Sequence, residues 1–407
     1  MNTVFTRSNK LNQVSYEIRG PILKEVKRLE AENQKITRLN IGSPAAFGLL
    51  APDTVVDEIK NNISLAQAQA YCDSNGIEQA RAAIVRYYQG KGVRNISVDD
   101  VYTGNGVSEL IMLVMQALLN MGDEVLVPAP DYPLWTGSVN FCQGKPVHYL
   151  CDEAADWMPD IRDVERKITA NTKAIVIINP NNPTGAVYSR DCMEQLVRLA
   201  EKHRLIIFSD EIYDKILYDG EKHVSPASMT EDTLVVTLSG LSKSHRMAGF
   251  RTGWMVLSGN REIAQDYIEG LGLLSSMRLC SNVPSQYAIC SALDGYQCIN
   301  DLVKPGGRLY QQRETAWRLL NEIPGVSCKK PRGAFYLFPR LDMERFGLKD
   351  DRQFALDLLR EKKILIVQGT GFNWFHPDHF RLVALMEPEG LTKAITDIRD
   401  FLSTYHQ

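Results

Sequence analysis

The chain has 407 residues, of which 44% are hydrophobic and 23% are charged. This composition is typical of globular proteins in water, and the length provides enough apolar material for a large core and a second, smaller one. The formal net charge of -3 gives no electrostatic reason to expect nucleic acid or an anionic membrane as a partner, so we expect small molecules as ligands.

The cysteines and the N-terminal residues indicate neither a metal site nor export. The 8 cysteines include no C-x-x-C pair, so neither a zinc knuckle nor a disulfide framework is predicted. Residues 1–20 lack the apolar core of a secretory signal, and no segment reaches the roughly 18 uninterrupted apolar residues of a membrane span. We therefore predict a cytoplasmic protein with free thiols, without a metal and without membrane contact.

The middle of the chain alternates short apolar runs with turn-rich stretches and helical patterns. The unit VYTGNGVSELIMLVMQALL at residues 101–119 predicts a short strand, a glycine turn and a helix. Four further apolar runs lack period-2 alternation and predict strands buried on both faces, at residues 124–127, 174–178, 205–208 and 234–238. We predict an α/β fold with a mostly parallel sheet flanked by helices.

Beyond about residue 300 the pattern becomes that of a smaller α+β unit. Its predicted elements are helix 311–321, strand 334–338, helix 354–361, strand 364–367, strand 380–385 and a final helix. We therefore expect three parts: residues 1–45 as an N-terminal segment that packs with the small domain, 46–305 as a large ligand-binding domain, and 306–407 as the small C-terminal domain.

Ligands of open α/β sheets bind beyond the carboxyl ends of the strands. Those ends supply Gly106 to Ser108, Tyr132, Asn182, Asp210 with Tyr213, and Lys243. Lys243, in SGLSKSHRMAGFRTGW, would most often be an exposed surface residue if it stood alone. Desolvated beside Arg246 and Arg251, it would instead have a lowered pKa and add to a carbonyl, while the two arginines would suit a phosphate.

Asp210 follows the apolar run at 205–208 and has two interpretations. It is a helix N-cap, with Ser209, for the segment EIYDKIL, or it is a buried carboxylate with a cationic partner. The pyridinium nitrogen of pyridoxal phosphate is such a partner, because a carboxylate beside it favours the protonated ring that acts as an electron sink. Tyr213, on the same predicted helical face, would donate to the phenolate oxygen of that ring.

Three more segments carry candidate ligand contacts. In NPNNPTG, the proline that follows Asn182 holds it extended, so its amide aims at a fixed point, although a plain turn asparagine is the alternative. In GNGVSEL, Glu109 replaces the third glycine of the dinucleotide fingerprint, which leaves a phosphate site on the N–H groups of Val107 and Ser108 and the Ser108 hydroxyl. Tyr132, in PAPDYPLW, is either a core residue or a ring that stacks on a planar cofactor.

Taken together, these motifs resemble the class I aminotransferases of the fold-type-I pyridoxal-phosphate group. The set comprises Y-x4-G from Tyr71 to Gly76, NPNNPTG, SDEIY, SGLSK, and Arg251 eight residues after the lysine, in the order found in the family. The match runs from NIGSP at Asn40 to HFRLVAL at His379. Stretches such as YCDSNG and INPNNPTGAVYS are similar to bacterial alanine (glutamate–pyruvate) aminotransferases.

The resemblance implies a cofactor and a role for each matching residue. The cofactor is pyridoxal 5'-phosphate, which Lys243 carries as a Schiff base while Asp210 partners the ring nitrogen. The other implied contacts are Asn182 and Tyr213 at the phenolate oxygen, Tyr132 on the ring face, Val107, Ser108 and Arg251 at the phosphate, and Arg381, Gly42 and Asn182 at the substrate α-carboxylate. Tyr71 would reach the phosphate of the neighbouring subunit, which implies a homodimer with shared active sites.

Two positions leave questions open. Gly240 stands three residues before the lysine, where many relatives carry a hydroxyl residue, so Ser239 or Ser242 is expected to replace that phosphate ligand. Arg278 aligns with the position from which dicarboxylate-specific relatives send an arginine across the dimer interface, but a purely structural interface role is the alternative.

The resemblance implies a ping-pong aminotransferase that moves an amino group between L-alanine/pyruvate and glutamate/2-oxoglutarate. Because the fold does not decide the fate of the substrate carbanion, a carbon–sulfur lyase with the same cofactor is one alternative, and an aminotransferase with another amino-acid preference is a second. A cofactor-sensing transcription regulator is a third, but it needs a fused DNA-binding domain, for which about 40 N-terminal residues leave little room.

Overall fold

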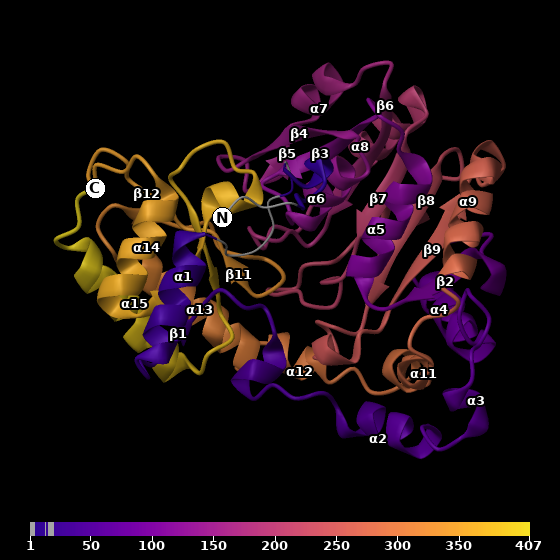
Figure 1. Ribbon diagram of the computed structural model, residues 1–407, viewed down its shortest axis with the longest axis horizontal. Helices are drawn as coiled ribbons and strands as arrows, with labels where there is room; N and C mark the ends of the chain where they lie inside the picture. The colour runs from indigo at the N-terminus through magenta and orange to yellow at the C-terminus, as the bar shows by residue number, and fades with distance from the viewer. Residues whose placement is uncertain (1–4, 13, 15–19) are drawn as a thin grey trace.

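The computed structural model describes residues 5–12, 14 and 20–407 (Figure 1). Positions 1–4, 13 and 15–19, which belong to the predicted N-terminal segment and to the stretch without a secretory signal, lie outside the described residues. None of the described helices has the length and apolar content needed to cross a membrane.

A large sheet forms the centre of the molecule. Over the described residues it has eight strands in the order β2-β9-β8-β7-β6-β3-β4-β5. Strands β4, β3, β6, β7 and β8 run parallel, whereas β2, β9 and β5 pair antiparallel with their neighbours. The strands are β2 (Val101–Gly104), β3 (Glu124–Ala129), β4 (Lys145–Asp152), β5 (Met158–Pro159), β6 (Thr172–Ile178), β7 (Ile206–Asp210), β8 (Leu234–Gly240) and β9 (Gly253–Gly259). The predicted α/β fold with a mostly parallel sheet is thus confirmed.

Strand β9 is not among the predicted strands, and it lies between β2 and β8. It pairs antiparallel with both, so Gly253 at its start lies opposite Gly240 and Gly104 at the ends of those two strands. The residues just before β9 therefore reach the same edge of the sheet as the residues just after the parallel strands. This explains how Arg251, which precedes a strand, arrives at the carboxyl edge.

Helices cover both faces of the sheet (Figure 1). Val125 and Val127 of β3 pack in a core with α5, α6 and α9, whereas Leu126 between them packs in a second core with α4, α8 and α11. This burial on both faces is the reason for the unbroken apolar runs. The covering helices are α4 (Glu78–Gly90), α5 (Val107–Leu118), α6 (Leu134–Phe141), α7 (Ile161–Lys167), α8 (Arg190–His203), α9 (Gln265–Met277) and α11 (Ala288–Asp294).

A further core joins N-terminal elements to the C-terminal part of the chain. Helix α1 (Pro21–Ala31) packs on α14 (Asp351–Lys362), β1 (Thr37–Arg38) pairs in parallel with β13 (Ile364–Leu365), and Figure 1 shows the indigo α1 among the orange and yellow helices. The other elements are α13 (Arg308–Asn321), β10 (Val326–Ser327), β11 (Tyr336–Leu337), β12 (Arg340–Leu341), β14 (Val367–Gln368), β15 (Phe380–Val383) and α15 (Pro388–Leu402). We call this assembly the small unit and the part around the large sheet the large unit.

The short elements differ most from the predicted ones. The strand predicted at 334–338 is limited to β11, and the strand predicted at 364–367 is divided into β13 and β14. The remaining helices connect the two units or line the large one: α2 (Asp53–Asn62), α3 (Ala66–Gln69), α10 (Val283–Gln286) and α12 (Ile299–Val303), with 3-10 turns that include η5 (Ala248–Phe250) and η7 (Gly369–Phe372).

Candidate active site

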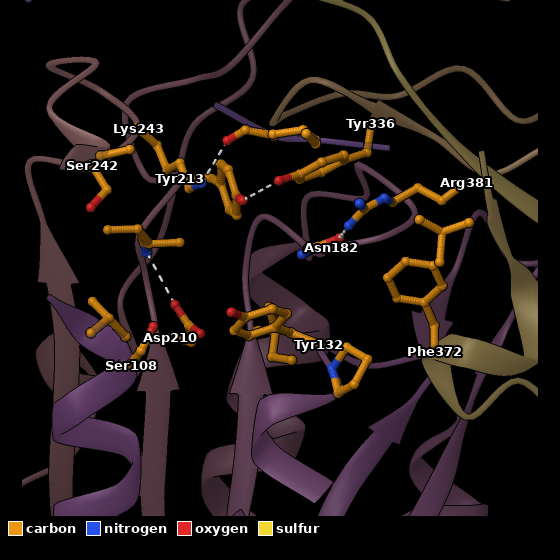
Figure 2. A pocket seen from close by; sticks show the side chains of 18 of the residues that line it. Ser108, Tyr132, Asn182, Asp210, Tyr213, Ser242, Lys243, Tyr336, Phe372 and Arg381 are labelled. Atoms are coloured by element: carbon orange, nitrogen blue, oxygen red, sulfur yellow. Dashed lines mark hydrogen bonds between the residues drawn. The ribbon is translucent and has the colours of Figure 1, made fainter. Parts of the chain in front are cut away.

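A cavity of about 570 Å³ lies where the carboxyl ends of the large sheet meet the small unit. Every strand-end segment singled out above contributes to its wall, with the residues Val107, Ser108, Tyr132, Asn182, Asp210, Tyr213 and Lys243 (Figure 2). The small unit and the segment before it add Asn40, Gly42, Tyr336, Phe372 and Arg381. The tertiary structure therefore brings the predicted strand-end residues together with the predicted Gly42 and Arg381, and adds Asn40, Tyr336 and Phe372.

Lys243 lies in the turn that follows β8, with its amine directed into the cavity. Its Nζ donates a hydrogen bond to the backbone oxygen of Gly42 at 2.8 Å. Burial, followed by the charges of Arg381 and Arg251, lowers the pKa of the amine to about 8. An amine with this pKa gives up its proton more readily than an ordinary lysine, which is the property expected of a lysine that reacts with a carbonyl.

Arg246 does not take part in the site, contrary to the expectation that two arginines flank the lysine. Its guanidinium donates to the backbone oxygens of Leu50 and Ser244, and it is not among the residues that line the cavity. Arg246 is three residues from Lys243 but lies in a turn with a positive φ of 59°, so spacing along the chain did not predict its direction.

Asp210 is the last residue of β7, and its carboxylate is buried at the floor of the cavity. Its Oδ2 accepts a hydrogen bond from the indole Nε1 of Trp135 at 3.1 Å, and its Oδ1 accepts one from the backbone N–H of Ile212 at 3.3 Å. Burial raises the pKa of this carboxyl group to about 6, against the effect of the two donors. It is thus a carboxylate at neutral pH that needs a cationic partner.

The helix predicted after Asp210 is absent, since residues 212–215 form turns and the residues on either side of them are irregular. The prediction that Asp210 is a helix N-cap is therefore wrong, and so is the prediction that it shares a helical face with Tyr213. The alternative, a buried carboxylate, is what the structure shows. The turn nevertheless directs the Tyr213 ring into the cavity. The strand simply ends at Asp210, and buried side chains after it pack against the small unit rather than along a helix.

Tyr336 of β11 is a cavity residue that the sequence motifs above do not include. Its hydroxyl lies 2.6 Å from the hydroxyl of Tyr213, and Figure 2 shows this contact closing the upper side of the cavity. A Cβ atom on Gly42 would lie 2.3 Å from the Tyr336 oxygen, which explains why glycine stands there. The segment GAFY, where an aromatic pair follows a glycine turn, is the signal that would have indicated it.

Arg381 of β15 reaches across from the small unit to the large one. Its Nη1 donates to the Oδ1 of Asn182 at 3.1 Å, and its Nη2 donates to the backbone oxygen of Asn40 at 2.6 Å. The rings of Tyr336 and Phe372 lie on its guanidinium, each with its centroid 4.7 Å from the central carbon. These contacts hold a planar fork of N–H groups in one orientation, which suits a carboxylate ligand.

The opposite end of the cavity is a site for an anion. Val107 and Ser108 begin α5, where unpaired backbone N–H groups and the helix dipole favour negative charge. Arg251 lies beside them and donates to the backbone oxygens of Ala248 at 2.8 Å and Asn105 at 3.2 Å. The pairing of a helix start with an arginine fits a phosphate group.

The structure distinguishes between the two serines near Gly240. Ser242 lines the cavity, whereas the hydroxyl of Ser239 donates to the backbone oxygen of Glu211 at 3.3 Å and is not among the lining residues. Gly240 itself lies against backbone, since a Cβ atom there would be 2.6 Å from the oxygen of Thr252. Ser242 is therefore the hydroxyl available at the anion end.

Tyr71 and Arg278 lie outside the cavity of their own chain. Tyr71 is 78% exposed. Arg278 is largely buried and forms an ion pair with Glu109 at 2.7 Å, with further hydrogen bonds to the backbone oxygens of Thr103 and Ser74. These partners within the chain favour the structural interpretation of Arg278. Over the described residues, no group of His, Cys, Asp or Glu side chains has a geometry that could hold a metal ion.

Comparisons with known proteins agree with this geometry. The family model described as aminotransferase class I and II matches residues 34–398. The chain is 58% identical over 402 residues to the glutamate-pyruvate aminotransferase AlaA of Escherichia coli, covering 98% of both chains, and 57% identical to an alanine aminotransferase of Mycobacterium bovis, covering 99% of this chain and 94% of the relative. An aminotransferase structure from Escherichia coli has a TM-score of 0.97 at 56% identity and full coverage of both chains, and an alanine aminotransferase structure from Pyrococcus furiosus has 0.92 at 37%, covering 98% and 100%.

Replacing Gly240 with serine tests whether a hydroxyl residue fits at this position. The added Cβ would lie 2.6 Å from the Thr252 oxygen and 2.8 Å from the Gly253 Cα, so β8 and β9 would have to separate, and we expect a loss of stability of about 1–3 kcal/mol. The measurement is the thermal midpoint, with Gly249→Ser as control because a Cβ there meets nothing within 4 Å. An unchanged midpoint in Gly240→Ser would contradict the steric argument.

Proposed function

Because the chain belongs to the class I and II aminotransferase family, we propose that it moves an amino group between L-alanine/pyruvate and glutamate/2-oxoglutarate with pyridoxal 5'-phosphate in a ping-pong cycle. The names of its relatives at 57% and 58% identity support these substrates. The observation that carries the proposal is one cavity that combines a lysine of low pKa, a buried carboxylate, an anion site and an oriented arginine.

The residues of the cavity fit the proposed cofactor at each of its polar groups. Lys243 would hold it covalently, Asp210 would partner the ring nitrogen, and Asn182 and Tyr213 would contact the phenolate oxygen. Tyr132 would stack on the ring, and Val107, Ser108, Ser242 and Arg251 would hold the phosphate. The buried Asp210 carboxylate supports this most directly, because a protonated ring nitrogen is the cationic partner that its burial requires.

When bound, the cofactor supplies a ring that accepts the electron pair left on the substrate Cα after proton loss. Asp210 would keep the ring nitrogen protonated, which would make that acceptance favourable. Its pKa of about 6 leaves it ionised near neutral pH, so its charge is available for this role. Trp135 holds the carboxylate through its indole N–H.

Lys243 is the proposed base that moves the substrate proton. Its pKa of about 8 makes the neutral fraction of Nζ near neutral pH much larger than that of an ordinary lysine, and a neutral amine would accept the Cα proton and return it during transfer. Burial, followed by the charges of Arg381 and Arg251, keeps that pKa low. Arg381 meanwhile would bind the α-carboxylate with its two Nη atoms, which orients Cα toward the lysine.

The proposed reaction is tested by mixing the holoenzyme with L-alanine and 2-oxoglutarate and quantifying the products. Equimolar pyruvate and glutamate are expected, with other amino donors at lower rates. A second assay, with cystathionine and no keto acid, separates the lyase alternative. Release of ammonia and thiol from cystathionine, together with no glutamate from alanine and 2-oxoglutarate in the first assay, would overturn the proposal.

Lys243→Ala removes the amine proposed as covalent anchor and base. We expect turnover to fall by at least about 100-fold, the lower range for loss of a general base. We also expect the cofactor to leave on denaturation even after borohydride treatment, because the variant has no imine that reduction could turn into a permanent link. The control is Lys222→Ala, an exposed lysine that should keep full activity. Turnover at the wild-type rate in Lys243→Ala would refute the assignment.

Arg381→Lys and Arg278→Ala separate the two carboxylate sites. A point charge cannot reproduce the fork of Arg381, so Arg381→Lys should raise the KM of alanine and of glutamate alike. The expected rise is about tenfold or more, which corresponds to the loss of one hydrogen bond to a charged group. Arg278→Ala should lower the thermal midpoint without discriminating between the two substrates, because its partners are Glu109 and backbone oxygens. If Arg278→Ala lost activity selectively with glutamate and 2-oxoglutarate, Arg278 would be shown to bind the side-chain carboxylate of these substrates.

We further propose a cytoplasmic homodimer in which Tyr71 of the partner subunit reaches the phosphate. Exposed apolar side chains support an association surface, since Leu273, Met277 and Leu279 are each exposed by half or more. The free cysteines suit a reducing compartment.

Sedimentation at working concentration should therefore detect no active monomer. Tyr71→Phe should weaken cofactor binding by about 1 kcal/mol, the value of one hydrogen bond. The control is Tyr296→Phe, which changes another exposed tyrosine, 77% exposed, and should leave cofactor binding unchanged. A fully active monomer would remove the shared-site proposal.

A further inference from the structure

His379 is a buried histidine two residues before Arg381, and it does not line the cavity. Its Nδ1 lies 2.7 Å from the Oδ1 of Asp378, and its Nε2 lies 3.5 Å from the Oε1 of Glu153. Asp378 belongs to the small unit, whereas Glu153 follows β4 of the large unit. The imidazole therefore lies between carboxylates that come from the two sides of the junction.

An aromatic cage encloses this imidazole. The Phe338 ring stacks on it at 4.7 Å with an interplanar angle of 21°, and Trp157 and Trp374 meet it edge-on at 5.3 Å and 5.4 Å. Trp157 comes from the large unit just before β5, and Trp374 also donates its indole N–H to Asp378 at 3.0 Å. The face of the stacked Phe338 ring is the negative side of its quadrupole and stabilises a cation that is removed from water.

The charges that face His379 favour its protonated form. Burial opposes the charge, but the hydrogen bond with Asp378 and the negative charges of Asp378 and Glu153 outweigh it and raise the pKa of the imidazole. The histidine in turn lowers the pKa of Asp378, against the effect of burial. Arg340 adds a further cation to this cluster, since it pairs with Asp378 at 3.1 Å and with Glu153 at 3.6 Å. Two carboxylates and two cations thus form one compact network.

His379 is also connected by its backbone to the elements that orient Arg381. Its carbonyl oxygen accepts a hydrogen bond from the N–H of Gly369 at 2.8 Å, and a Cβ atom on Gly369 would lie 2.7 Å from that oxygen. Gly369 begins η7, which ends with Phe372, one of the two rings on the Arg381 guanidinium. Strand β14 pairs Val367 with Arg381 itself. Displacement of His379 would therefore move both the arginine and a ring that holds it.

We propose that His379 is a positioning residue: as an imidazolium between Asp378 and Glu153, it clamps the strand that carries Arg381 to the large unit, and loss of its proton loosens this clamp. The proposal rests on the proposed role of Arg381 in binding the substrate α-carboxylate. It adds a pH-dependent control of substrate affinity that is separate from the titration of Lys243.

The direction of the pH effect follows from the raised pKa. A group whose pKa is higher in the folded protein contributes stability that is complete below its unfolded value, about 6.5 for histidine, and is lost as the pH rises through the folded value. Affinity for every carboxylate substrate should therefore fall toward alkaline pH. Lys243 acts on proton transfer instead, so its titration should appear mainly in kcat.

The test compares the wild-type holoenzyme with His379→Gln and with the control His376→Gln, which changes an exposed histidine three residues away. At about pH 6.5, His379→Gln should raise the KM of both alanine and 2-oxoglutarate by about three- to tenfold, with kcat changed by less than about threefold. At about pH 9.5 the wild-type KM should approach that of the variant, whose KM should be flat between these pH values. His376→Gln should follow the wild type throughout.

A KM in His379→Gln equal to that of the wild type at both pH values overturns the positioning role. Thermal midpoints provide a readout that does not depend on activity: the midpoint of His379→Gln should be lower than that of the wild type at acidic pH, and the difference should shrink toward alkaline pH. A difference of the same size at both pH values overturns the ionic clamp. Glu153→Gln, which removes the carboxylate of the large unit but keeps its size, should show the same KM trend to a smaller extent, and an unchanged KM there also counts against the clamp.

Failure of the proposed function is distinguishable from failure of this inference. If Arg381→Lys leaves substrate binding intact, the role of Arg381 is wrong. The pH dependence of the thermal midpoint still tests the His379 network in that case, because it requires no substrate.

Discussion

An excess of positive charge in a confined space governs the site. Lys243, Arg251 and Arg381 face one cavity, and among its described lining residues Asp210 is the carboxylate that opposes them. Burial, followed by repulsion from the two arginines, lowers the pKa of the lysine. The arginines have no lower-charge form near neutral pH and remain cations. Such an arrangement is favourable only if anions occupy it, which is why a phosphate at one end and a carboxylate at the other suit it so well.

The two ends of the cavity are built in different ways. The anion end belongs to the large unit, where the start of α5 and the turn before β9 meet because β9 runs antiparallel between two parallel strands. The carboxylate end depends on the junction, because Arg381 extends from β15 to Asn182 in the large unit. The contact between Tyr213 and Tyr336 links the two ends. Substrate affinity should therefore be the property most sensitive to how the units are held together, and that is where the His379 network lies.

Arg278 bears on the proposed substrate range. Its guanidinium forms an ion pair with Glu109 and hydrogen bonds with backbone oxygens of its own chain, which favours a structural role. A dry pocket with a fixed cation for the substrate side chain would leave that charge unpaired whenever alanine binds, which is costly. A pocket without such a cation avoids this cost and accommodates side chains of both kinds, in agreement with the proposed exchange between alanine and glutamate.

The residues at the strand ends could be predicted from the amino-acid sequence alone. Apolar runs without alternation identify strands buried on both faces, and the rule that ligands bind beyond such strands is enough to select Asn182, Asp210 and Lys243. A glycine turn followed by an amphipathic helix marks a helix start, which likewise selects Val107 and Ser108. Burial and periodicity are local properties, so a local pattern reports them well.

Features that depend on contacts between distant segments were settled only by the tertiary structure. Neither the antiparallel placement of β9 nor the turn that replaces a helix after Asp210 follows from local pattern, since both result from packing against other elements. Trp135 and Tyr336 were missed for the same reason, because a buried aromatic residue is normally interpreted as part of the core. Only the structure shows the indole N–H of Trp135 beside Asp210 and the hydroxyl of Tyr336 beside that of Tyr213. The direction of a side chain is set by the partners that surround it, and those partners come from parts of the chain that only folding brings together.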